Sequence, residues 1–192
     1  MKNILEGFVP YEKQDADKYN KLRWWAGLTL GDIFDRAADV FPEKEAFVDG
    51  NSRLSYGEAR EKTNKLAIGM VELGLQPLDR VLIQLPNWNE FVFAYFALQK
   101  IGAIPVLLIE RYRPFEINHL IGLTGATFWI VPARYKKTDF IPIINDVLKV
   151  HPELKQIIAV RGNGDQPSFS RLEKLIEETQ LTEANLGRLT DR

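Results

Sequence analysis

The stretch from Asp79 to Leu107 constrains the fold most strongly, because it reads as a strand, a helix and a second strand in direct succession. The apolar, β-branched run Arg80–Leu85 predicts the first strand, which ends at Pro86. Trp88–Ile101 predicts the helix, and Ala103–Leu107 predicts the second strand. A helix that connects two strands of one sheet makes those strands parallel, so the sequence predicts a βαβ unit.

Both ends of this helix carry capping signals. Asn87, followed by Glu90 three residues later, predicts an N-cap with a carboxylate that reaches back to it. Gly102 stands where helices commonly end in the left-handed conformation. Residues 91–98 are apolar nearly all round the helix, so we expect this helix to lie inside the protein.

Similar signals occur on both sides of this unit. A capping residue with a carboxylate three positions later occurs at Thr29 and Asp32, at Ser55 and Glu58, and at Ser170 and Glu173. Helices are predicted over Leu30–Val40 (with Ile33, Phe34, Ala37 and Phe41 as its apolar stripe), from the Ser55 cap to Gly74, and over Pro114–Leu123, Asp139–Val150 and Arg171–Thr179. Strands are predicted over Thr127–Val131 and Gln156–Val160, and a hairpin over Ala46–Asp49 and Arg53–Tyr56, with Gly50-Asn51 as its turn.

This alternation predicts an α/β fold: a mostly parallel sheet with helices on both faces, preceded by an N-terminal arm, a helix and a small β-hairpin. We expect residues 1–28 to form the arm, extended over residues 1–23, residues 29–180 the α/β body, and residues 181–192 a polar tail. Trp24 and Trp25 allow two interpretations: they pin the arm to the body, or they form a surface on which a ligand stacks.

Composition excludes several function classes. The chain has 192 residues, of which 45% are apolar, and 25 basic residues nearly balance 26 acidic ones, so we expect no nucleic-acid partner and no acidic-membrane partner. The absence of cysteine excludes thiolate metal sites and cysteine nucleophiles. The first residues do not resemble a secretory signal, and the apolar stretch Phe91–Ile109 is interrupted by polar residues, glycine and proline, so we expect a cytoplasmic protein.

No catalytic or nucleotide-binding motif is complete, and we assign no catalytic, cofactor-binding or metal-ligating residue. Gly162 and Gly164 follow a strand but are succeeded by Pro167, which indicates a turn rather than a phosphate loop. His119 and His151 lack a second ligand at helical spacing.

Two arginines leave one alternative open. Arg111 and Arg113 follow the strand Ala103–Leu107, at the sheet edge where ligands of open α/β proteins bind. They are either solvated partners of Glu110 and Glu116 or anion-binding residues of a small independent enzyme.

Separated blocks of the chain carry a resemblance to a known family. They are AFVDGNSRLSYGEAREKTNKLA (Ala46–Ala67), ELGLQPLDRVLIQLPNWNEFVFAYFALQKIGAIPV (Glu72–Val106) and PFEINHLIGLTGATFWIV (Pro114–Val131). The chain resembles, from about Trp24 to Val160, the front end of the acyl-adenylate-forming ligase superfamily, the AMP-dependent synthetases and ligases. Trp25–Ile33 is most similar to the aryl branch, the 2,3-dihydroxybenzoate-AMP ligases and their relatives. One departure is Leu78, where the family usually has glycine.

The resemblance implies a parent enzyme that uses ATP and magnesium to form an acyl- or aryl-adenylate. The acyl group then passes to a thiol of coenzyme A or of a carrier-protein phosphopantetheine. The family's phosphate-binding segment and its catalytic lysine do not occur in these 192 residues. We therefore expect an N-terminal fragment that is inactive alone, needs the remainder of the ligase chain, and self-associates. The alternative is a stand-alone non-catalytic binding or regulatory module built on the same scaffold.

Overall fold

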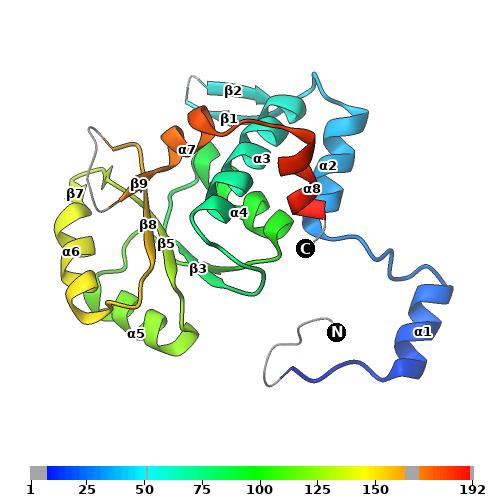
Figure 1. Ribbon diagram of the computed structural model, residues 1–192, viewed down its shortest axis with the longest axis horizontal. Helices are drawn as coiled ribbons and strands as arrows, with labels where there is room; N and C mark the ends of the chain where they lie inside the picture. The colour runs from blue at the N-terminus through cyan, green and yellow to red at the C-terminus, as the bar shows by residue number, and fades with distance from the viewer. Residues whose placement is uncertain (1–7, 51, 163–168, 191–192) are drawn as a thin grey trace.

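Five parallel strands form the main sheet of this computed structural model, which describes residues 8–50, 52–162 and 169–190. The strands lie in the order β4-β3-β5-β8-β9, and every neighbouring pair is parallel. Their bounds are β3 Arg80–Ile83, β4 Ile104–Leu107, β5 Phe128–Pro132, β8 Gln156–Val160 and β9 Ser170–Arg171. The predicted α/β class with a mostly parallel sheet is confirmed (Figure 1).

The predicted βαβ unit is present, but the prediction of Asn87 as the N-cap of its helix is wrong. Helix α4 spans Asn89–Ile101 between β3 and β4, and Gly102 ends it with φ 78°. The N-cap residue is Trp88, which makes no side-chain cap; Asn87 lies in a bend before it, in which the Trp88 N–H donates to the Pro86 carbonyl oxygen at 2.7 Å. The carboxylate of Glu90 binds Arg161 instead of turning back to the cap. No residue of α4 is exposed, in agreement with the predicted interior position.

Helices cover both faces of the sheet, and the strand residues alternate between the two cores. Val81, Ile83 and Ile130 pack with α3 (Tyr56–Glu72), α4 and α7 (Leu172–Glu178). Leu82 and Trp129 point to the opposite face, toward α5 (Pro114–Thr124) and α6 (Ile141–Val150). Figure 1 shows the two groups of helices on opposite sides of the strands. Each face is therefore closed by its own helices.

In the elements before the sheet, the predicted helix caps at Thr29 and Ser55 are confirmed, whereas the predicted apolar stripe of the first helix is partly wrong. Helix α2 (Leu30–Val40) and helix α3 each begin with a reciprocal capping box, at Thr29 and Ser55. In α2 the buried residues are Gly31, Phe34 and Ala38, whereas Ile33 and Phe41 of the predicted stripe are each 53% exposed. The hairpin pairs β1 (Glu45–Asp49) with β2 (Ser52–Ser55), and Asn51 of its predicted turn lies outside the described residues.

The sequence predicted an extended arm over residues 1–23, but the arm contains a helix. Residues Lys13–Lys21 form helix α1, in which no residue is buried. This helix lies apart from the α/β body in Figure 1. Trp24 and Trp25 pack on Tyr19 of this same arm, so they do not pin the arm to the body.

The C-terminal segment also differs from its prediction. Ser170 does not cap a helix, because Ser170 and Arg171 form β9 beside β8, and α7 begins at Leu172. The residues expected as a polar tail contain helix α8 (Glu183–Thr190), which packs against α3 and α4. The predicted start of α6 at Asp139 is likewise wrong, because it is too early: Arg134–Tyr135 (β6) and Thr138–Asp139 (β7) form a small ribbon, and α6 begins at Ile141.

Leu78 occupies a glycine-like conformation. Its φ is 69°, in the left-handed region that costs a residue with a Cβ about 1 kcal/mol or more. Its backbone N–H donates to the Gly102 carbonyl oxygen at 2.8 Å, which fixes the turn between α3 and β3. This conformation explains physically why glycine suits the position at which the sequence departs from the family pattern.

No helix in the described part of the chain combines the length and the apolar character that crossing a membrane requires.

Candidate functional site

The loops that follow β3 and β4 enclose a groove of about 570 Å³ at the carboxyl edge of the sheet. Ligands of open α/β proteins bind at this edge, which makes the groove the candidate site. Leu85, Trp88 and Phe91 line it after β3, and Leu107 and Ile109 line it after β4. Tyr135, Asp49 and Glu110 complete its wall. Most of the lining residues are apolar, and Asn87 and the carboxylates of Asp49 and Glu110 add polar surface.

A buried glutamine positions the loop after β4. Gln84 is fully buried, and its side-chain Nε2 donates to the carbonyl oxygens of Ile109 and Tyr112 at 3.2 and 3.1 Å. A buried amide that has such partners fixes its loop, because losing them would leave polar groups unsatisfied. The wall formed by Leu107 and Ile109 is therefore anchored, although both side chains are more than half exposed, at 55% and 54%.

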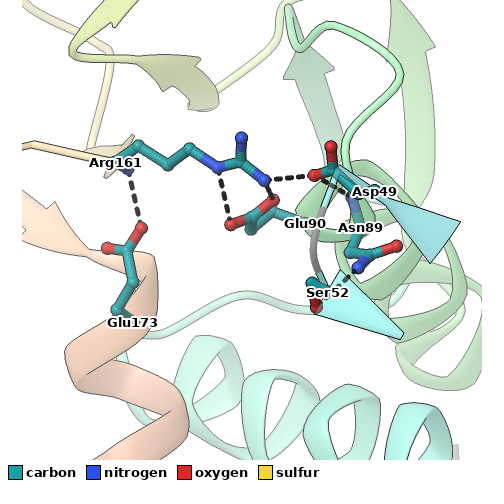
Figure 2. A network of polar contacts seen from close by, with 6 residues as sticks. All are labelled: Asp49, Ser52, Asn89, Glu90, Arg161 and Glu173. Atoms are coloured by element: carbon teal, nitrogen blue, oxygen red, sulfur yellow. Dashed lines mark hydrogen bonds and ion pairs between the residues drawn. The ribbon is translucent and has the colours of Figure 1, made fainter. Parts of the chain in front are cut away.

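Arg161 joins four elements beside the groove (Figure 2). Its Nε and Nη2 donate to the two carboxylate oxygens of Glu90, both at 2.9 Å, and Nη2 also pairs with Asp49. Its backbone N–H donates to Glu173 at 2.7 Å. These bonds connect the end of β8 to the hairpin, to the first turn of α4 and to α7. The Glu90 and Asp49 side chains are only 15% and 18% exposed.

An aromatic side chain completes the surroundings of this guanidinium. The Arg161 guanidinium carbon lies 4.0 Å from the centre of the Trp88 ring, a cation–π contact. Trp88 in turn meets Tyr135 edge to face at 5.6 Å. Partial burial alone would lower the pKa of Arg161, but the hydrogen bonds to Glu90 and Asp49 outweigh it, so the pKa is raised. The guanidinium is therefore a permanent cation held by fixed partners.

The geometry favours a structural clamp over a reaction centre. Asp49 and Glu90 are committed to Arg161, which leaves neither free as a general base. Within the described ranges, no group of three or more histidine or acidic side chains could hold a metal ion. The groove offers apolar and aromatic side chains, which recognise other apolar surface, beside the polar groups of Asp49, Asn87 and Glu110.

The arginines considered in the sequence do not act together. Arg113 donates through Nη1 to the carbonyl oxygens of Glu110 and Tyr112, and through Nη2 to Thr138. Its guanidinium also lies over the Phe140 ring at 5.7 Å. Arg111 is exposed on the same loop. Arg113 thus holds its own loop, and the structure gives no support to an anion site built from this pair.

The other candidate residues have local roles. His119 is exposed on α5, and His151 ends α6 with its Nδ1 at 2.6 Å from Glu153. A Cβ on Gly162 would meet the Ala133 Cβ at 3.1 Å, so glycine allows a close approach there. Gly164 lies outside the described residues.

Sequence reasoning missed Arg161. A single arginine after a strand matches no motif, and its partners Glu90 and Asp49 lie 71 and 112 residues away. Arg161 has a φ of 54°, which marks a strained position that only the structure reveals.

A second pocket, of about 450 Å³, contains a buried lysine. Lys100 on α4 pairs with Asp35 of α2, and its side chain is only 8% exposed. Burial lowers the pKa of Lys100, and the hydrogen bond that its ammonium donates to Asp35 offsets this only in part. Leu186 and Leu189 of α8 close one side of this pocket.

Comparison with known proteins identifies the family to which this chain belongs. The family of AMP-binding enzymes matches residues 34–185, which is most of the chain. The chain belongs to the AMP-binding enzyme family. The groove and the Arg161 clamp are thus features of a family member, and the family resemblance predicted from the sequence is confirmed.

Relatives within the family include enzymes named for aromatic acids. The chain is 35% identical over 175 residues to the 2,3-dihydroxybenzoate-AMP ligase of Bacillus subtilis (strain 168), covering 91% of this chain and 32% of that protein. It is 34% identical over 173 residues to the salicyl-AMP ligase / salicyl-S-ArCP synthetase of Mycobacterium tuberculosis (strain ATCC 25618 / H37Rv), covering 88% of this chain and 31% of that protein. The predicted similarity to the aryl branch is confirmed by these matches.

Solved structures agree. The apo structure of Mycobacterium smegmatis MbtA matches with a TM-score of 0.78 and 27% identity, covering 92% of this chain and 32% of that chain. A match of this coverage includes part of residues 1–28. The chain spans about a third of the length of these family members.

Proposed function

We propose that this chain is the N-terminal portion of an ATP-dependent carboxylate ligase. The complete enzyme would form an acyl- or aryl-adenylate and pass the acyl group to a thiol, either coenzyme A or a carrier-protein phosphopantetheine. The observation that carries this proposal is the family match over residues 34–185. The names of the relatives, which are ligases of aromatic acids, favour an aromatic carboxylic acid as substrate.

The described residues do not fit ATP or magnesium by themselves. ATP needs donors for its phosphates and magnesium needs free carboxylate or phosphate oxygens. At the carboxyl edge the clamp already uses Arg161, Glu90 and Asp49 for one another. The role of this chain in the parent enzyme would therefore be structural: it supplies a braced half of the sheet, against which the residues that handle the nucleotide are placed.

An exchange assay tests the proposal. The 192-residue chain and the product of its full reading frame are assayed for ATP–pyrophosphate exchange with 2,3-dihydroxybenzoate, salicylate and a medium-chain fatty acid, which represent acids named by the relatives. We expect exchange from the full product and none from the 192-residue chain. Exchange by the short chain would contradict its inactivity. A reading frame that ends at Arg192 would instead support a stand-alone binding or regulatory module.

Self-association of the isolated chain is part of the same proposal. Leu107 and Ile109 are more than half exposed beside the groove, and large exposed apolar patches favour association. The edge strand β4 is less suited to pairing, because Pro105 has no N–H at a position directed away from β3. We expect concentration-dependent sedimentation that Ile109→Asp reduces. A monomer at all concentrations would contradict this part.

A further inference from the structure

The arm carries a group of aromatic side chains in mutual contact, here called the aromatic cluster: the exposed Tyr11, Trp24 and Trp25, and the half-buried Tyr19. Tyr19 stacks on Trp24 with ring centres 5.4 Å apart and meets Trp25 edge-on at 5.1 Å. Tyr11 meets Trp25 edge-on at 5.0 Å. A turn at Arg23, with φ 57°, allows the N–H groups of both tryptophans to reach the Tyr19 carbonyl oxygen. The cluster is therefore built by the arm itself.

This cluster presents much apolar surface to solvent. Tyr11 is 70% exposed and Trp24 is 66% exposed, and Leu22 beside them is 49% exposed. The ring contacts described for both tryptophans are to other arm residues. Figure 1 shows the arm standing away from the sheet and its helices. Exposed aromatics that are already ordered resemble the central residues of protein interfaces, because little side-chain freedom remains to be lost on binding.

Basic residues lie beside the aromatic cluster. Lys18 and Lys21 are in the last turn of α1, and Arg23 follows in the turn that leads to the tryptophans. All three are exposed, whereas the exposed acidic residues of the helix, Asp15 and Asp17, lie farther from the tryptophans along the chain. A surface that receives the cluster should therefore be apolar with carboxylates at its rim.

The length of the relatives indicates where that surface lies. The structural match to MbtA includes part of the arm, although that chain is about three times as long as the portion matched. The relative that matches part of the arm therefore contains much more polypeptide than the portion matched. Because the cluster is exposed in this chain and the relative has additional polypeptide, we take that polypeptide, and not a second copy of this chain, as the occupant.

We propose that the aromatic cluster docks on the remainder of the ligase chain, on an apolar surface rimmed by carboxylates. This inference rests on the proposed function, because it needs that remainder to exist. The arm then acts as a strap that joins the first and later parts of the enzyme, and Trp24 and Trp25 are its anchors.

Hydroxyl-radical footprinting read by mass spectrometry tests this directly, because it reports each tryptophan separately without mutation. The 192-residue chain is compared with the product of the full reading frame, and the fully buried Trp129 serves as the internal standard. We expect Trp24 and Trp25 to be oxidised several-fold more slowly in the long product, with Trp129 equally protected in both. Equal oxidation of Trp24 and Trp25 in the two proteins would overturn the proposal. Protection that appears in the short chain as its concentration rises would also overturn it, because the occupant would be a second copy.

A paired variant separates docking from folding. Trp24→Ala combined with Trp25→Ala should lower the unfolding midpoint of the long product and leave that of the 192-residue chain unchanged. Gln14→Ala, an exposed change on the same helix, is the matched control and should change neither. An equal loss in both proteins would assign the tryptophans to the stability of this chain and overturn the docking role. If the long product is active in ATP–pyrophosphate exchange but Trp24 and Trp25 are not protected from oxidation in it, only the docking of the arm is refuted. A reading frame that ends at Arg192 refutes both the docking and the proposed function.

Discussion

Arg161 and Glu90, 71 residues apart in the chain, are joined by two hydrogen bonds of 2.9 Å, one from Nε and one from Nη2. The forked geometry matches the two oxygens of one carboxylate, which only arginine among the basic residues can do. Because Asp49 shares Nη2, this one side chain fixes the hairpin and the first turn of α4 against the end of β8.

Replacement of Arg161 should therefore destabilise the fold. We expect Arg161→Ala to cost about 2 kcal/mol in the free energy of unfolding, since Glu90 and Asp49 would remain largely buried without their partner. Arg161→Lys should be intermediate, because an ammonium keeps the charge and loses the fork. Urea unfolding measures both. Arg134→Ala, which removes a surface pair at 3.8 Å to Asp139, is the control and should cost less than about 1 kcal/mol. Equal losses at the two arginines would contradict the clamp.

Leu78 offers a test of backbone strain. Leu78→Gly should relieve the left-handed conformation at φ 69°, whereas Leu78→Ala removes the same packing and keeps the strain. We therefore expect the Leu78→Gly variant to be more stable than the Leu78→Ala variant by about 1 kcal/mol, measured by thermal or urea unfolding. The reverse order would show that the turn does not need a glycine-like residue.

Lys100 should make stability depend on pH. Burial lowers its pKa below the ordinary value of 10.5, so between the two values the unfolded chain binds more protons than the folded one. Stability then rises with pH in that window, and below the lowered pKa the penalty is fully present. The Lys100→Met variant has no titratable group at this position. The stability difference between this variant and the native chain should therefore change in favour of the native chain as pH rises toward 10.5. Parallel pH profiles in urea unfolding would refute the burial effect.

Two serines that carry the same sequence signal should respond differently. Ser55 accepts a hydrogen bond from the Glu58 N–H at 3.2 Å at the start of α3, so Ser55→Ala should cost about 1 kcal/mol. Ser170 has a glutamate at the same spacing but lies in β9, and Ser170→Ala should cost less than about 0.5 kcal/mol. Urea unfolding of the two variants decides the matter, and a larger loss at Ser170 would contradict the assigned start of α7.

The contrast between Ser55 and Ser170 also shows how far sequence reasoning reaches. Local signals predicted the βαβ unit, the hairpin and the boxes at Thr29 and Ser55, since these depend on residues a few positions apart. The cap at Asn87 failed because the carboxylate of Glu90 is used by Arg161, a residue that no local pattern connects to it. Ser170 failed for a similar reason, because pairing with β8 took precedence over the capping signal.

The candidate site was the least predictable part. Its position at the carboxyl edge follows from the fold, and the loop containing Arg111 and Arg113 was placed there correctly. Their roles were not foreseen, because Arg113 binds carbonyl oxygens of its own loop. The α1 helix and the exposed Trp24 show the same limit, since burial depends on what lies opposite a side chain and not on its type.

The strand order has a consequence for biosynthesis. Once β4 has paired with one side of β3, β5 pairs with the other side of β3, and β8 and β9 are then each added next to the sheet strand made before them. A nascent chain leaving the ribosome can thus build the sheet in the order of translation, without waiting for a distant strand to insert between two that are already paired.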